Sequence, residues 1–183
     1  MSSSTLITPP EHAAQRPIAL TLGDACGIGP ETLVRAFARG EADDCVVYGD
    51  AAWLARTARA LTFSPDSSRP VIVALDDLAE WTTTPPGAIP VLPIVELPQD
   101  LIVGQVDARA GAAAFACIDA AAHDALAGRV AAVVTAPIHK EALHAAGVDF
   151  PGHTEILQHL AGGMPVRMML ANDELRTVLV SIH

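Results

Sequence analysis

Two short segments of the sequence combine residue types that could bind an anionic ligand. In the first, Gly152, His153, Thr154 and Glu155 stand where an apolar helical pattern begins. Glycine lets a backbone approach a ligand closely, and the adjacent imidazole and hydroxyl offer two hydrogen-bonding groups for a phosphate or a carboxylate. The alternative is an ordinary helix start, in which His153 or Thr154 caps the helix and Glu155 favours its first turn. The residues alone leave both interpretations open.

The second segment is TAPIHK, residues 135–140, which follows the apolar run VAAVVT. Ligands in open α/β sheets gather at the carboxyl ends of strands, so Thr135, His139 and Lys140 are well placed for binding. In the alternative, Lys140 is a solvated helix residue and His139 is a helix cap. His183 ends another apolar run, and the carboxyl end of a strand is a normal place for a metal-binding imidazole.

A glycine-rich turn, GDACGIGPE, occupies residues 23–31. Its glycines match neither the G-x-G-x-x-G spacing of a dinucleotide-binding loop nor the spacing of a P-loop. Such a turn at a helix start can present free backbone N–H groups to an anion. It can equally be a strand-to-helix turn that requires glycine geometry.

The hydrophobic pattern predicts the alternating strands and helices of an α/β protein. Strands are expected over 17–22, 45–48, 71–74 and 130–135, the last three of them buried. Helices are expected from Pro30 to a stop at Gly40, over 51–60, over 107–127 before Gly128, and over 141–145 before Gly147. Five prolines between residues 82 and 98 indicate an edge strand and a loop. The runs 167–171 and 176–182 are predicted to form a hairpin around residues 172–175.

Composition narrows the class of protein and its partners. The 183 residues are 51% hydrophobic and carry a formal net charge of -10 without any Lys/Arg cluster, which argues against a nucleic-acid binder. No apolar segment approaches the roughly 18 residues of a membrane span and no secretion signal is recognisable, so no membrane partner is expected. Cys26, Cys45 and Cys117 lack C-x-x-C spacing and are expected to be reduced thiols of a cytoplasmic protein.

Four motifs together resemble the 4-hydroxythreonine-4-phosphate dehydrogenase family, which makes a precursor of pyridoxal phosphate. They are GDACGIGPE at 23–31, GQVDARAG at 104–111, TAPIHK at 135–140 and FPGHTE at 150–155, and the resemblance continues through MMLANDELRTVLVSIH. Ala25 and Cys26 depart from the proline and alanine that are common in the family. Family members are longer, and the chain resembles their amino-terminal half. We therefore expect a loose tail over 1–16 and a partial α/β dehydrogenase region, truncated at its carboxyl end, over 17–183.

The resemblance implies a fold and a set of binding residues. The expected architecture is α/β and similar to isocitrate and isopropylmalate dehydrogenases, with two domains of which this chain holds only the amino-terminal part. By resemblance, His153 and Thr154 bind the substrate and His183 binds a divalent metal, zinc, magnesium or cobalt. The separation of 30 residues between His153 and His183 (183 − 153) agrees with the spacing in the family. A homodimer is implied for the complete protein.

The resemblance also implies a reaction. NAD or NADP would oxidise 4-(phosphooxy)-L-threonine, which then loses carbon dioxide to give 3-amino-2-oxopropyl phosphate for pyridoxal phosphate (vitamin B6) biosynthesis. The metal would lower the pKa of the alcohol and stabilise the enolate. One alternative is a sister dehydrogenase acting on a phosphorylated threonate or erythronate, and another is an inactive fragment or binding module. Because the family's other metal histidines and most of its NAD contacts lie in its second half, the 183 residues alone are expected to be inactive.

Overall fold

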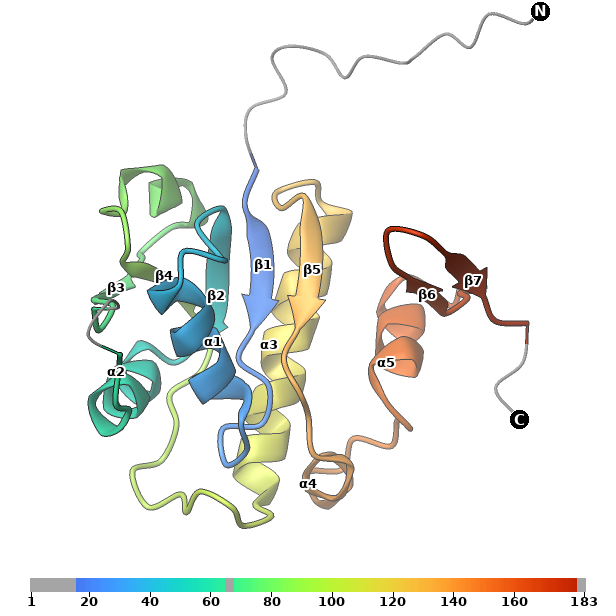
Figure 1. Ribbon diagram of the computed structural model, residues 1–183. Helices are drawn as coiled ribbons and strands as arrows, with labels where there is room; N and C mark the ends of the chain where they lie inside the picture. Colours follow the sequence, from blue (N-terminus) through green and yellow to red (C-terminus); the bar gives the residue numbers. More distant parts are fainter. Residues whose placement is uncertain (1–15, 65–67, 181–183) are drawn as a thin grey trace, which may run out of the picture.

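A five-stranded parallel sheet forms the centre of the structure, a computed structural model that describes residues 16–64 and 68–180. The strand order is β3-β4-β2-β1-β5, and every pairing in this sheet is parallel (Figure 1). The strands are β1 (Ile18–Thr21), β2 (Cys45–Gly49), β3 (Ile72–Ala74), β4 (Ile89–Pro93) and β5 (Ala132–Thr135). This sheet confirms the α/β class expected from the sequence.

Helices connect the strands, because parallel neighbours need crossover connections. They are α1 (Gly29–Ala38), α2 (Ala51–Ala60), the 3-10 helix η1 (Leu78–Thr83), α3 (Ala108–Leu126), α4 (Lys140–Ala145) and α5 (His153–Leu160). Figure 1 shows α1 and α3 on opposite faces of the sheet. All five residues of β2 are buried, as an uninterrupted apolar run in a central parallel strand should be.

Local start and stop signals set the element boundaries. The helix expected over 51–60 is observed as α2, and Asp50 caps its first turn by accepting a hydrogen bond from the Trp53 N–H at 3.0 Å. Gly40, Gly128 and Gly147 follow the ends of α1, α3 and α4 with positive φ angles of 70°, 72° and 79°. The glycine stops are therefore confirmed.

Two expectations about the sheet are wrong. The proline-rich stretch does not form an edge, because β4 lies between β3 and β2 with Ile89 and Val91 fully buried. Pro90 is tolerated since the β2–β4 register starts one residue later, at Val47↔Val91. Two of the strands expected to be buried, β3 and β5, form the edges of the sheet instead. No residue of β3 is buried, and Val134 of β5 is 51% exposed. An apolar run does not report how many strands flank it.

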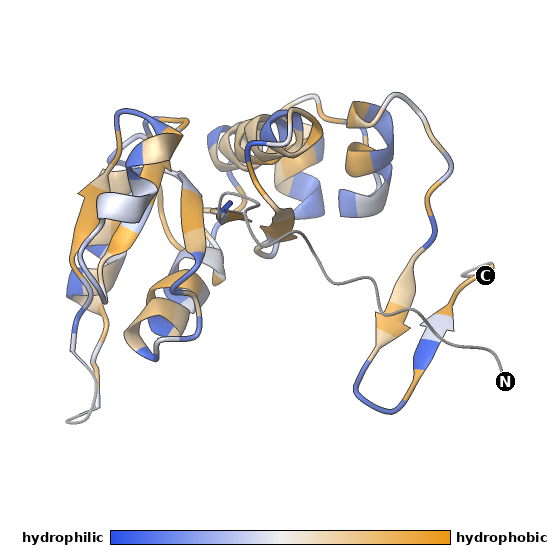
Figure 2. Cartoon of the chain, turned by 90° about the horizontal axis from the view of Figure 1, so that it is seen from above, coloured by the Kyte–Doolittle hydropathy of each residue, from blue (hydrophilic) through white to orange (hydrophobic). Residues whose placement is uncertain are grey.

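A hairpin follows α5, as predicted. Its strands β6 (Met169–Ala171) and β7 (Arg176–Val178) pair antiparallel, and the Asn172 side chain accepts hydrogen bonds from the Glu174 and Leu175 N–H groups at 3.0 and 2.7 Å. The hairpin stands apart from the main sheet (Figure 2) and its strand residues are exposed. Residues 1–15 of the expected tail, and His183, lie outside the described residues.

A second, smaller core carries the helices that follow the sheet. Ile118 of α3, Leu143 of α4 and Ile156 of α5 are fully buried against one another. The rings of Phe115 and Phe150 stack beside them, with centroids 6.4 Å apart. Helices α4 and α5 are therefore fixed to α3 by contacts of their own.

The cysteines are unpaired, as expected of reduced thiols. Cys26, Cys45 and Cys117 are all buried, and burial raises the pKa of each thiol, that of Cys117 to about 12. Among the described residues, no helix combines the length and apolarity that crossing a bilayer requires.

Candidate functional site

A pocket of about 550 Å³ brings the two candidate segments together. The residues that line it come from the start of α4, from the start of α5 and from the segments on either side of the β6–β7 hairpin. The polar and charged residues that line it are Lys140, His153, Thr154, Glu155 and Arg167. Apolar residues such as Met168 and Leu179 complete the wall. Two cations and one carboxylate thus border a pocket in a chain whose formal net charge is -10.

The start of α5 lacks a side-chain cap. Gly152 is the N-cap residue, and neither His153 nor Thr154 caps the helix, because both lie inside its first turn. The capping alternative for these two residues is therefore wrong. Their side chains remain at the pocket, beside the first-turn N–H groups that give a helix start a partial positive charge.

The His153 imidazole is a neutral hydrogen-bonding group at neutral pH. Burial lowers its pKa below the ordinary value of 6.5, and an interaction with the Ala136 backbone works in the opposite direction without cancelling that shift. Its Nε2 atom is inaccessible to solvent and has no hydrogen-bond partner among the described residues. A buried polar atom without a partner costs about 1–3 kcal/mol, so a ligand group that reaches this nitrogen would gain a strong contact.

One of the three polar candidates in TAPIHK reaches this pocket. Lys140 is the first residue of α4 and lines the pocket, whereas Thr135 and His139 are not among its lining residues. His139 occupies the N-cap position of α4 but makes no side-chain cap hydrogen bond, so the alternative that made it a cap is wrong. His153 joins the two segments through its interaction with Ala136.

The glycine turn supports the TAPIHK segment. Gly23 has a φ of 70°, and a Cβ atom there would lie 2.5 Å from the Pro137 carbonyl oxygen. The next N–H, that of Asp24, donates to the same oxygen at 2.9 Å. The buried Asp24 carboxylate accepts a hydrogen bond from the Cys26 N–H at 3.0 Å, so a carboxylate of the turn itself already binds a backbone N–H of the turn. This arrangement favours the structural interpretation of GDACGIGPE over the anion-binding one.

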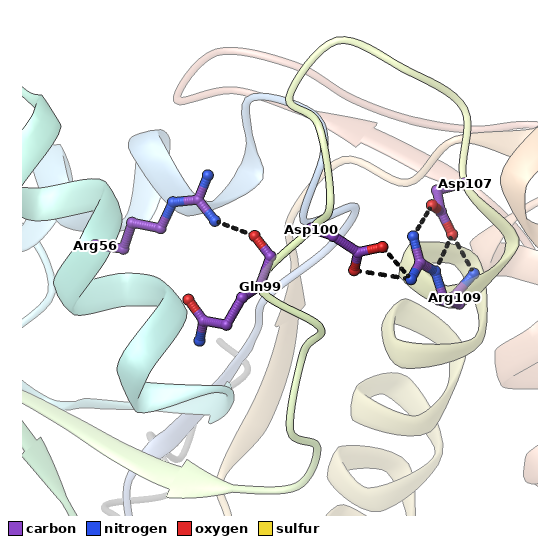
Figure 3. A network of polar contacts seen from close by, with 5 residues as sticks. All are labelled: Arg56, Gln99, Asp100, Asp107 and Arg109. Carbon is purple, nitrogen blue, oxygen red and sulfur yellow. Dashed lines mark hydrogen bonds and ion pairs between the residues drawn. The ribbon is translucent and has the colours of Figure 1, made fainter.

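The two charged side chains of the GQVDARAG motif, Asp107 and Arg109, bind each other. Arg109 donates to both carboxylate oxygens of Asp100 at 2.9 and 3.0 Å and to Asp107 at 2.7 Å (Figure 3). Hydrogen bonds from Arg109 lower the pKa of Asp107 to about 2. Arg56 of α2 donates to the Gln99 carbonyl in the same loop at 3.2 Å. The network holds the loop between β4 and α3 in place.

The last glycine of that motif sets the distance between two helices. A Cβ atom on Gly111 would lie 2.1 Å from the Ala142 carbonyl oxygen, so α3 and α4 touch through their backbones. Sequence reasoning missed this role. The available signal was a glycine inside an alanine-rich helix, where it lowers helix propensity and therefore needs a packing reason.

The described residues do not form a metal site. Within 16–64 and 68–180, no three His, Cys, Asp or Glu side chains are grouped closely enough to hold a metal ion. His183, the predicted metal ligand, lies outside these ranges. A divalent metal therefore finds no ligand set in the described part of the chain, and its place stays a prediction.

The fold and the pocket define a parallel-sheet α/β protein with a polar pocket, and the segment that follows the carboxyl end of β5 brings Lys140 to its lining. A family model described as pyridoxal phosphate biosynthetic protein PdxA matches residues 41–183. The chain belongs to this family, which confirms the resemblance of its motifs.

Individual relatives agree with the family. A 4-hydroxythreonine-4-phosphate dehydrogenase from Beijerinckia indica is 41% identical over 168 residues, which are 91% of this chain and 48% of the relative. A D-threonate 4-phosphate dehydrogenase from Pectobacterium atrosepticum is 40% identical over 169 residues, 91% of this chain and 50% of the relative. The solved 4-hydroxythreonine-4-phosphate dehydrogenase from Klebsiella pneumoniae matches with a TM-score of 0.79 and 41% identity, over 89% of this chain and 50% of that one. The chain spans about half the length of the curated relatives it matches.

Proposed function

We propose that this chain supplies the substrate-binding part of a cytoplasmic dehydrogenase that acts on a small phosphorylated hydroxy acid. The observation that carries the proposal is the pocket that brings His153 and Thr154 together with Lys140. The names of the two relatives support the substrate class, since each is a dehydrogenase of a 4-phosphorylated hydroxy acid.

The first candidate substrate is 4-(phosphooxy)-L-threonine, oxidised and decarboxylated to 3-amino-2-oxopropyl phosphate in pyridoxal phosphate biosynthesis. The family description supports this pathway. The second candidate is D-threonate 4-phosphate, supported by the Pectobacterium relative. Both compounds have a carboxylate at one end and a phosphate at the other. They differ in the group on the carbon next to the carboxylate, an amine in the first and a hydroxyl in the second.

In this proposal His153 and Thr154 position the substrate. With its other ring nitrogen bonded to the Ala136 backbone, the neutral imidazole offers Nε2 as an acceptor, and the Thr154 hydroxyl can both donate and accept, so together they can hold a substrate alcohol in register. NAD or NADP accepts the hydride, and a zinc, magnesium or cobalt ion acts on the alcohol. We propose His183 as one ligand of that ion, with the remaining ligands supplied by residues outside these 183. We also propose that the complete protein is a homodimer. Turnover by the 183 residues alone is not expected.

Substrate binding by the chain itself tests the proposal. Isothermal titration calorimetry with both phosphorylated acids should give saturable binding, and His153→Ala should weaken it by roughly tenfold or more because a buried hydrogen bond is lost. His144→Ala is the matched control, since His144 is exposed and its side chain contacts Asp149 rather than the pocket. If His153→Ala lowers the melting temperature but leaves the affinity for both phosphorylated acids unchanged, residues 152–155 have a structural role and do not bind the substrate. Absence of binding in the parent chain would favour an inactive fragment or a different binding module.

The metal ligand is tested in the complete protein. His183→Ala should lower divalent-metal affinity, and affinity in the parent should fall below a pH of about 6.5 as imidazoles protonate. Equal affinity in parent and variant would remove His183 from the ligand set.

A further inference from the structure

Lys140 is the only lysine in the chain. The other ten basic residues, apart from histidines, are arginines, and one of them, Arg167, shares the lining of the pocket with Lys140. The two side chains are not interchangeable. Arginine presents a flat fork suited to a carboxylate, whereas lysine presents a compact ammonium with three donors that can turn toward a tetrahedral anion. The chain's single lysine thus lies at its candidate site.

The Lys140 ammonium is uncommitted. It has no ion pair or hydrogen bond to another described residue, whereas Arg35, Arg109 and Arg129 are each paired with a carboxylate. The acid that shares the pocket lining is Glu155, in the first turn of α5. An unpaired cation at the edge of a pocket is available to an incoming anion.

The backbone that carries Lys140 is held rigidly from two directions. Asp24 donates its N–H to the Pro137 carbonyl oxygen at 2.9 Å, three residues before the lysine. On the far side, α4 touches α3 where Gly111 meets Ala142, two residues after the lysine. A fixed Cα atom limits the positions the ammonium can reach, which lowers the entropy lost on binding.

We propose that Lys140 binds the phosphate group of the substrate, and that this contact distinguishes phosphorylated from unphosphorylated hydroxy acids. The proposal rests on the proposed function and assigns the phosphate end of the ligand to the α4 side of the pocket. A phosphate carries more charge than a carboxylate and offers three acceptor oxygens, which suits a mobile ammonium. Lys140 is a positioning residue here and takes no part in hydride or proton transfer.

Because Lys140 carries the chain's only ε-amine, its environment can be read directly. Trace acetylation followed by peptide mass spectrometry would measure the reactivity of this one amine, with the α-amino group as internal reference. Inorganic phosphate and D-threonate 4-phosphate, each at about ten times its Kd, should slow acetylation of Lys140 by about tenfold. Unphosphorylated D-threonate should leave the rate unchanged. Equal protection by phosphorylated and unphosphorylated acids would overturn the assignment of the phosphate.

Substitutions provide the second measurement. Lys140→Met should weaken D-threonate 4-phosphate binding by about 10- to 100-fold and leave the weak binding of D-threonate unchanged, because one charge-assisted contact is lost. Lys140→Arg should retain part of the affinity. Arg59→Met is the control for net charge, since Arg59 is exposed on α2 and away from the pocket.

The outcomes separate this inference from the proposed function. If His153→Ala weakens binding of the phosphorylated acid and Lys140→Met does not, the phosphate assignment is wrong and the proposed function stands. If the parent chain binds neither acid, both are wrong.

Discussion

The close contact between Gly111 and α4 predicts that Gly111→Ala lowers the free energy of unfolding, although helix propensity alone would raise it. Gly111→Ala would place a Cβ atom 2.1 Å from the Ala142 carbonyl oxygen and 2.3 Å from its carbonyl carbon, well inside the 3.0 Å below which Cβ atoms essentially never lie. Propensity alone would stabilise the helix by about 1 kcal/mol. Overpacking costs about 1–3 kcal/mol or more, and here the obstacle is backbone that cannot rotate away. We expect a net loss of about 2 kcal/mol in the free energy of unfolding.

Urea unfolding followed by circular dichroism measures this free energy. Ala112→Gly is the matched control, because Ala112 is the next residue of α3 and is exposed. It should lose about 1 kcal/mol from propensity alone. If Gly111→Ala instead gains about 1 kcal/mol, the two helices do not touch at this point and the reasoning fails. Since α4 begins at Lys140, the same variant should also weaken ligand binding in folded protein, which calorimetry would detect.

Three further predictions concern buried polar groups and pH. Asp50→Ala should cost about 3 kcal/mol in urea unfolding, because the buried carboxylate caps α2 and also accepts the Leu97 N–H at 2.6 Å. Tyr48→Phe should cost about 1–2 kcal/mol by the same assay, since it removes the buried 2.6 Å hydrogen bond to Asp124. Burial lowers the pKa of His153 below 6.5, so the unfolded chain binds this proton more tightly. The free energy of unfolding should therefore fall as pH drops below about 6.5, and less so in His153→Gln.

Each of these three predictions has an outcome that would contradict it. Asp50→Asn keeps one acceptor oxygen and should lose less than the alanine variant, and equal losses would mean that the two backbone hydrogen bonds contribute little. A Tyr48→Phe variant as stable as the parent would mean that its hydroxyl contributes no net stability. Identical pH profiles for the parent and His153→Gln would show that this imidazole is not desolvated in the folded chain.

Local signals predicted most of the elements. Glycine stops and capping residues act within one turn, so the ends of α1, α2, α3 and α4 could be placed from sequence. The hairpin was predictable because Asn172 sits where a turn needs a side-chain acceptor. Strand order was not predictable, since pairing between β2 and β4 joins segments that only the complete sheet brings together. The proline content of β4 therefore predicts an edge strand, although β4 lies inside the sheet.

The candidate site likewise contains some residues that local sequence could predict and others that it could not. The local pattern of a helix start with two hydrogen-bonding groups made His153 and Thr154 candidates, and the family resemblance decided for binding over capping. Lys140 was a candidate because it follows a strand. Arg167 could not, because its place in the lining depends on how the hairpin returns toward α5. Whether Gly23 served an anion or a neighbouring segment also required coordinates, since both uses need the same residue type.

The contacts that fix the site are separate from those that build the sheet. Lys140 and His153 sit on helices whose buried residues, Leu143 and Ile156, pack with Ile118 of α3 in the second core. The main core, which contains Val46 and Val47 of β2, lies on the sheet. A change in the sheet interior should therefore act chiefly on global stability. A change in α3 on its α4 side alters the relative position of the two pocket segments while the sheet stays folded. Because α3 packs on both, it is the element through which a perturbation of the sheet would reach the site.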